Sequence, residues 1–206
     1  MPRPALLDRA MVLAETLRLA DERGLDAVSM RAVAERLGVT PMALYRHVGD
    51  KRALLDGLVE QLLAELPLPD PALPWRQRLD GMAAALRATA RRHPTVFPLL
   101  LRRPVVTEGA LRVREAVYQA LRDAGLTEPE VRRAERMLST FLIGFAASES
   151  GGRFSVTAAQ LDADLAWFGE QLICAIAPQD EQRGARPGDC AQRGETPAST
   201  SAMKDG

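Results

Sequence analysis

The chain has 206 residues, of which 47% are hydrophobic and 26% are charged, and its 27 Lys and Arg residues balance its 27 Asp and Glu residues. This composition is typical of a globular protein, and a formal net charge of zero excludes nucleic-acid binding driven by bulk basicity. We find no basic and apolar leader and no apolar run near 18 residues, so we expect a cytoplasmic protein with no membrane partner. The two cysteines, Cys174 and Cys190, have neither the spacing of a metal site nor that of a disulfide framework.

Helical spacing of apolar residues predicts the first helix, and Gly24 is placed to end it. Its apolar positions are Leu6, Ala10, Leu13, Leu17 and Ala20. Together with the two short helices that follow, it predicts a three-helix head at the N-terminus.

Residues 29–51 have the pattern of two short helices joined by a tight glycine turn. Ser29 suits the N-cap of the first, and Gly38 can take the left-handed conformation that ends it. Thr40 and Pro41 suit the N-cap and first position of the second. With Leu44 and Val48 turned inward, the second helix leaves outward Met42, Ala43, Tyr45, Arg46 and His47. The pattern predicts a helix-turn-helix whose second helix can enter a DNA groove.

Placement of basic residues, and not their number, supports this interpretation. Residues 1–52 carry nine basic and seven acidic side chains, a difference of only +2. Basic side chains gather near one predicted face, at Arg31, Arg46, His47, Lys51 and Arg52. The chain has only two lysines, Lys51 and Lys204, so Lys51 is an unusual choice and a candidate phosphate contact.

The rest of the chain is also predicted to be helical. Asp50 suits the N-cap of a longer helix that ends before the prolines of residues 67–74. The next helix has its apolar positions from Leu79 to Ala90 and is expected to stop near His93 and Pro94. A short apolar piece spans 96–101, and another helix ends at Gly125. Capping-box sequences at Thr127 and Thr157 open the last two helices, at about 130–149 and 158–177.

No segment alternates apolar and polar residues over the length of a strand, so the predicted fold is all-α. We expect a helix-turn-helix DNA-binding domain at 1–52 and a helical ligand-binding and dimerisation domain at 53–178. Residues 179–206 hold almost no large apolar side chain and are expected to be a disordered tail.

The head resembles the TetR family of transcriptional regulators, and its tetracycline-repressor branch in particular. The resemblance is carried by Leu-Tyr-Arg-His-Val at 44–48 followed by Lys-Arg-Ala-Leu-Leu at 51–55. It implies a homodimeric repressor whose paired heads bind a palindromic operator and whose body binds a small-molecule effector. The same resemblance implies that Arg31 contacts a base or a phosphate. It places Thr40, Pro41 and Met42 at the end of the reading helix that enters the groove. It implies that phosphates are bound by Tyr45, His47 and Lys51.

The sequence also departs from the tetracycline-repressor branch. There the drug is held through a magnesium ion bound by a histidine, at a position that falls near Phe97 or Pro98 here. Neither side chain can ligate a metal, so we expect no metal and no cofactor. His93, the only histidine of the body, precedes a proline at a helix end and is expected to be a cap or a surface group.

Candidate ligand contacts in the body are apolar side chains with a few polar ones. Apolar walls are expected from Phe97, Leu100, Leu101, Phe141, Phe145 and Trp167, and polar contacts from Arg103, Thr140, Ser148 and Glu149. Any apolar member of this set can equally be plain core. As a set they fit an apolar cavity with few polar groups.

The two final helices are apolar on more than one side, which requires two sets of neighbours. A second copy of the chain could supply one set in a four-helix bundle, and a larger monomeric core is the alternative.

The sequence can be compared with three classes of function: a ligand-responsive repressor, an enzyme, and a DNA-bound structural or interaction protein. A ligand-responsive repressor fits both the predicted head and the predicted body. An enzyme is not supported, because the chain lacks a glycine-rich phosphate loop, an HExxH motif and a nucleophile elbow. A DNA-bound structural or interaction protein on the same fold would have no effector, and its body would be well filled.

Overall fold

The computed structural model describes residues 7–102 and 108–176. Every regular element in these two ranges is a helix, so the predicted all-α class is confirmed. Arg103 and the proposed tail at 179–206 lie outside the described residues. Within the described part of the chain, no helix combines the length and the apolar character that crossing a membrane requires.

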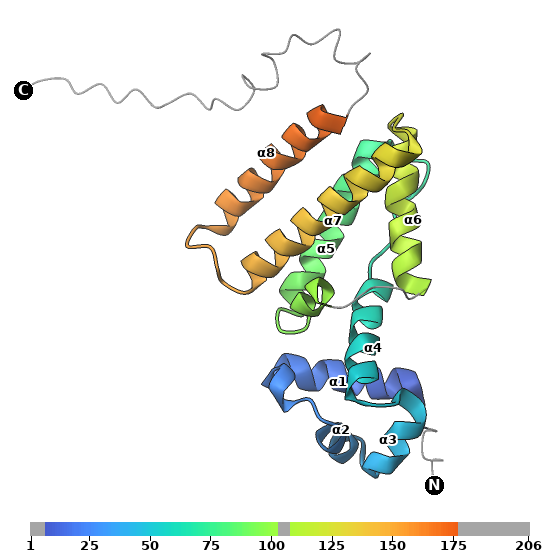
Figure 1. Ribbon diagram of the computed structural model, residues 1–206. Coiled ribbons are helices and arrows are strands. Elements are labelled where there is room, and N and C mark those ends of the chain that lie inside the picture. The colour runs from blue at the N-terminus through green and yellow to red at the C-terminus, as the bar shows by residue number, and fades with distance from the viewer. Residues whose placement is uncertain (1–6, 103–107, 177–206) are drawn as a thin grey trace, which may run out of the picture.

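Three helices form the predicted head: α1 (Arg9–Arg23), α2 (Met30–Leu37) and α3 (Pro41–Val48). Figure 1 shows them at one end of the molecule, with α3 on the side away from the rest of the chain. A short 3-10 helix, η1 (Leu25–Ala27), connects α1 to α2.

The predicted caps and turn of the head are confirmed. Ser29 Oγ accepts a hydrogen bond from the backbone N of Ala32 at 3.1 Å, and Thr40 Oγ1 accepts one from the backbone N of Ala43 at 3.3 Å. Gly38 lies between them with φ of +66°, a conformation that other residues adopt only at a cost. The two caps thus set where α2 and α3 begin, and the glycine turn sets the angle between them.

α4 (Lys51–Ala64) leaves the head and runs toward the body, with Asp50 as its N-cap. α5 (Trp75–Arg92) then crosses the body, beginning directly after Pro74 and therefore earlier than its apolar spacing alone indicated. The predicted short apolar piece is a 3-10 helix, η2 (Phe97–Leu101).

The body is completed by α6 (Glu108–Asp123), α7 (Glu128–Ser150) and α8 (Ala158–Ile176). Both capping boxes are present: Glu130 accepts from the backbone N of Thr127 at 2.8 Å, and Gln160 accepts from that of Thr157 at 3.0 Å. Figure 1 shows α8 standing apart from α7 along most of its length.

One continuous cluster of buried apolar side chains extends from α1 through α4 and η2 to α7. Phe97 is its largest fully buried member, and it lies in η2, where the head meets the body. A smaller cluster around Leu121 and Val131 joins α6 to α7. The core therefore connects head and body, and the body has less buried apolar volume near α8.

Candidate nucleic-acid interface and ligand cavity

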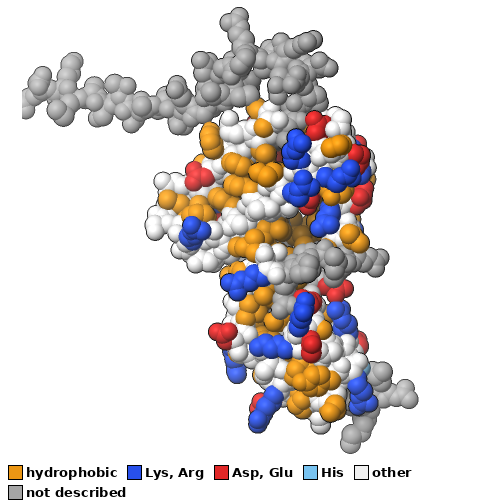
Figure 2. Space-filling model, in the orientation of Figure 1, with side chains coloured by type: hydrophobic (Ala, Val, Ile, Leu, Met, Phe, Trp, Pro, Cys, Tyr) orange, Lys and Arg blue, Asp and Glu red, His pale blue; other side chains and the backbone are white. Residues whose placement is uncertain are grey.

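The outer face of α3 is as open as its sequence predicted. Met42 is 70% exposed and Tyr45 is 48% exposed, whereas Leu44 and Val48 are buried against the head. Figure 2 shows apolar side chains at this end of the molecule with Lys and Arg side chains beside them. A helix that packs on the head through one face and exposes the opposite face is suited to insertion into a DNA groove.

Several positive or titratable side chains around α3 are available for an external partner. Four of these side chains are exposed and make no hydrogen bond or ion pair with any other described residue: those of Arg31, Arg46, His47 and Lys51. Pro41 and Thr40 are exposed at the start of α3, and Ser29 is half-buried at the start of α2. The structure thus brings the nine predicted DNA-contact residues to the α2 and α3 end of the head.

Arg36 shows the contrasting case of a head arginine used internally. Its guanidinium donates to Glu15 and, at 2.6 Å, to Glu22, both on α1. Hydrogen bonds to Glu22 and Glu15 raise the pKa of Arg36 above its usual range. These contacts hold α2 against α1, so Arg36 contributes to the support of α3 and not to its open face.

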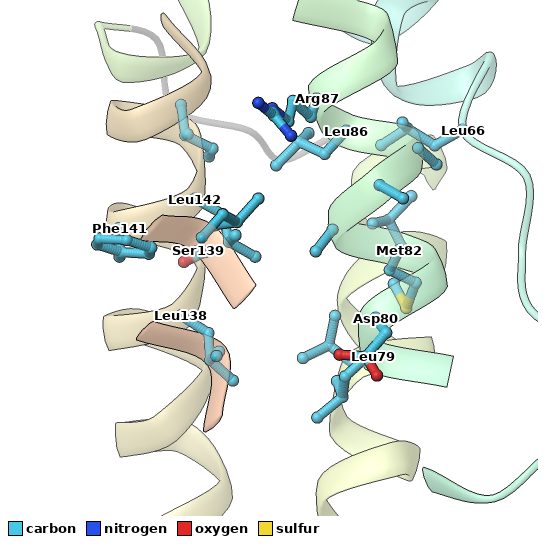
Figure 3. Close-up of a pocket in the computed structure, with 18 of the residues that line it drawn as sticks. Leu66, Leu79, Asp80, Met82, Leu86, Arg87, Leu138, Ser139, Phe141 and Leu142 are labelled. Carbon is cyan, nitrogen blue, oxygen red and sulfur yellow. The ribbon is translucent and has the colours of Figure 1, made fainter. Parts of the chain in front are cut away.

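A cavity of about 550 Å³ lies in the body, a size typical of sites for drug-sized molecules. It is bounded by the end of α4 and by α5, α6, α7 and α8. Figure 3 shows its walls on α5 and α7, among them Leu79, Met82, Leu86, Leu138 and Leu142. Its surface is mainly apolar, with a few charged groups.

The predicted ligand contacts divide into two groups. Leu100 and Phe141 line the cavity. Phe97 is fully buried in the core, while Leu101 and Trp167 are 54% and 57% exposed, and none of these three lines the cavity. Residue type alone did not distinguish these side chains from the cavity residues, because the packing of distant helices decides which of them faces the cavity.

Phe145, Ser148 and Glu149 lie on α7 beyond the cavity walls. The Phe145 ring packs near the Phe141 ring, at a centroid distance of 5.8 Å. Glu149 accepts hydrogen bonds from Arg87 at 2.7 Å and from Arg91, and the bond from Arg87 is the main cause of its lowered pKa. Glu149 therefore holds α7 to α5 through an ion pair.

Sequence reasoning missed the contribution of α5, which supplies a large part of the cavity wall. The available signal was the run of small side chains at Ala83, Ala84 and Ala85, all of which line the cavity. Gly169 on α8 adds to this space, since a Cβ placed there would meet no atom within 4 Å. Small residues on two facing helices leave a hollow that larger ones would fill.

Asp80 of α5 is a further cavity residue that the sequence did not single out. Figure 3 shows its carboxyl group on the cavity side of α5, next to Leu79. Loss of hydration raises the pKa of Asp80, Arg76 opposes this rise, and Glu170 adds to it. The carboxyl group thus stands at a largely apolar surface.

His93 connects the body directly to the head. Its Nδ1 lies 2.7 Å from Asp21 Oδ2 on α1, and its Nε2 lies 3.5 Å from Glu65 Oε2 at the end of α4. His93 is also the C-cap residue of α5, as its position before a proline indicated. We call His93, Asp21 and Glu65 the His93 junction.

Among the described residues, no group of three or more His, Cys, Asp and Glu side chains is arranged to hold a metal ion.

Two family models match the chain. Residues 12–58 match the model described as bacterial regulatory proteins, tetR family, and residues 68–167 match the tetracyclin repressor-like C-terminal domain. These ranges contain the open face of α3 and most of the cavity wall.

Individual relatives agree with these matches. The transcriptional repressor DrrR1 of Streptomyces coeruleorubidus is 37% identical over 153 residues, which is 72% of this chain and 55% of that protein. The chain therefore spans little more than half the length of that repressor.

Solved structures show the same architecture. A TetR variant from Acinetobacter baumannii AYE in complex with minocycline has a TM-score of 0.68 and 31% identity, over 86% of this chain and 98% of that one. BioQ with its double-stranded DNA operator has a TM-score of 0.70 and 25% identity, over 83% and 98% of the two chains. This chain belongs to the TetR family of bacterial regulatory proteins.

Proposed function

We propose that this protein is a transcriptional repressor that binds a palindromic DNA operator as a homodimer and releases it when a small, mainly apolar molecule occupies the body cavity. The observation that carries the proposal is that one chain combines an open, supported α3 face with a cavity of about 550 Å³. The DrrR1 repressor, the operator-bound BioQ and the minocycline-bound TetR variant support each half of this function.

DNA recognition would divide between two groups of side chains. Tyr45, His47 and Lys51 would hold phosphates, which position the head without selecting a sequence. Thr40 and Met42, at the start of α3, would reach base edges or thymine methyl groups. Because residues 1–52 carry little net charge, affinity depends on these few local contacts.

Dimerisation would use α7 and α8. Met137 on α7 is 65% exposed and Trp167 on α8 is 57% exposed, although both are large apolar side chains. A second copy of the chain would cover these faces and bring two α3 helices to the spacing of successive major grooves, about 34 to 36 Å.

Release would follow from the contact of the cavity with both the end of α4 and α5. α4 supplies Leu63 to the cavity wall and packs on the head at its other end, and the His93 junction adds a second link from α5 to α1. A ligand that prefers one arrangement of α4 and α5 would shift the separation of the two heads in the dimer.

A DNA-binding protein on this fold without an effector is the alternative. Its body would be well filled, and the cavity favours the ligand-responsive repressor instead.

The test of DNA binding uses an operator selected from random duplexes. Lys51→Ala and Tyr45→Phe should weaken binding to the operator and to scrambled duplex alike, and Lys51→Ala should reduce the salt slope by about one. Arg132→Ala is the control, because it removes one positive charge from α7, far from α3. A Lys51→Ala protein that binds both duplexes as tightly as the wild type would contradict the proposed interface.

The test of release uses diphenylhexatriene, an apolar fluorescent molecule. It should gain fluorescence on entering the cavity and should lower operator occupancy equally with and without EDTA. Ala83→Phe fills the cavity and should abolish both effects while operator affinity is kept. Release that disappears with EDTA would instead indicate a metal-dependent site.

A further inference from the structure

The charged residues around the cavity are not balanced. Acidic lining residues are Asp80, Glu135, Asp162 and Glu170, and basic ones are Arg87 and Arg114. The lining thus holds four acidic side chains against two basic ones. An anionic ligand would meet an excess of like charge here, which makes a neutral or cationic ligand the better match.

Three of the four acidic residues already have a cationic partner. Asp162 and Arg87 form an ion pair, and Glu170 pairs with Arg76. Glu135 lies 3.8 Å from Arg114, measured from Oε1 to Nε. A ligand would have to compete with these arginines for the carboxylates.

Asp80 is different, because its carboxyl group has no hydrogen bond or ion pair with any other described residue. Arg76, one helical turn earlier, is placed to pair with it at the i, i+4 spacing but reaches across to Glu170 on α8. Figure 3 shows the Asp80 oxygens on the cavity side of α5, with Leu79 beside them and Leu138 on the facing helix.

Asp80 is exposed at the cavity surface, and although Arg76 lies near enough to attract it, no cationic side chain of the described residues is in ion-pair contact with its carboxylate. A cation that enters the same space would stabilise the ionised carboxylate beside these apolar groups. We propose that the cavity selects organic cations, in which an amine or quaternary ammonium group is attached to an apolar body, and that Asp80 recognises the positive charge. This inference rests on the proposed function, since it assumes that the cavity is the effector site.

The remaining walls fit the apolar body of such a molecule. Phe141 and Phe168 stack with a centroid distance of 3.7 Å and present an aromatic surface at the cavity. Leucines and alanines supply most of the other contacts. Burial of the apolar body would provide most of the affinity, and Asp80 would provide the choice between charges.

The experiment compares three fluorescent molecules that share one apolar body: diphenylhexatriene, its trimethylammonium derivative and its propionic acid derivative. For the full-length wild type we expect the cation to bind most tightly and the anion most weakly. Asp80→Asn, which keeps the shape and removes the charge, should weaken binding of the cation about tenfold and leave the neutral molecule unchanged, a difference of about 1.4 kcal/mol.

Asp164→Asn is the matched control, because Asp164 lies on α8 outside the cavity lining and its loss removes the same charge. It should leave all three affinities unchanged. Thermal melts of both variants check that the fold is intact. Asp80→Asn should melt no lower than the wild type, because loss of hydration and Glu170 outweigh Arg76 and leave the charged form of Asp80 disfavoured.

The outcomes separate the two proposals. Equal loss of cation binding in Asp80→Asn and Asp164→Asn, or equal binding of all three molecules to the wild type, would overturn the role of Asp80 and leave the repressor function standing. Failure of all three molecules to bind would overturn both the cation selectivity and the effector cavity.

Discussion

The head and the body use their helices in opposite ways. In the head, short helices are packed around fully buried residues such as Leu44 and Val33, and the open surface lies outside, on α3. In the body, longer helices enclose an open space, and α8 approaches α5 and α7 mainly through individual ring contacts and ion pairs. The head therefore presents a fixed surface, whereas the body has space for a small molecule.

The largest expected effect tests whether these two parts unfold together. Phe97 is fully buried where the core of the head meets that of the body, so Phe97→Ala should lower the free energy of unfolding by about 3 to 5 kcal/mol. Leu101→Ala, in the same 3-10 helix but 54% exposed, should change it by no more than about 0.5 kcal/mol. Circular dichroism melts should show one shifted transition for Phe97→Ala, and loss of the body's transition alone would show that the parts are independent.

The second prediction addresses the fixed surface itself. Met42→Ala and Thr40→Ala should each change the preferred base at a few positions of each half-site, since a good base contact contributes roughly 1 to 3 kcal/mol of discrimination. Thr40→Ser is the control, because it keeps the hydroxyl that caps α3 at Ala43. Selection from random half-sites measures the preference, and an unchanged consensus in both alanine variants would contradict base contact by the start of α3.

The third prediction compares a glycine of the head with one of the body. Gly38 has a φ of +66°, so Gly38→Ala should destabilise the protein by about 1 to 2 kcal/mol even though a Cβ there would meet no atom within 4 Å. Gly81 lies inside α5 with the same open space but without a positive φ, and Gly81→Ala should stabilise the protein by about 0.5 to 1 kcal/mol. Urea unfolding measures both, and a shift of the same sign would refute the backbone explanation.

These contrasts also explain what could be predicted from the sequence. The head was predictable down to the caps at Ser29 and Thr40 because each depends on residues three positions apart. The helices of the body were predictable for the same reason, and both capping boxes are present. The cavity wall was not, because Leu100 and Leu101 are neighbours with similar side chains and only the former faces the hollow.

Asp80 shows why charged cavity residues escape sequence reasoning. Its spacing from Arg76 is that of an ordinary surface ion pair, but Arg76 pairs instead with Glu170, some ninety positions later. The same holds for Glu149, whose partners Arg87 and Arg91 come from another helix. Long-range partners of this kind depend on the assembled body.

The smallest expected effect concerns the link between the two parts. His93→Ala removes the contact of α5 with Asp21 on α1, and Arg92→Ala is the matched control, because Arg92 contacts Glu65 at 3.4 Å. Each variant loses one side chain from the same end of α5, but only the first loses a contact with the head.

The core around Phe97 still joins the two parts, so both variants should bind the operator within a few-fold of the wild type. His93→Ala should need several-fold more of the trimethylammonium derivative to release the operator, which corresponds to about 1 kcal/mol of coupling between cavity and head. Operator-release titrations measure this shift, and equal responses of the two variants would assign the coupling to α4 alone.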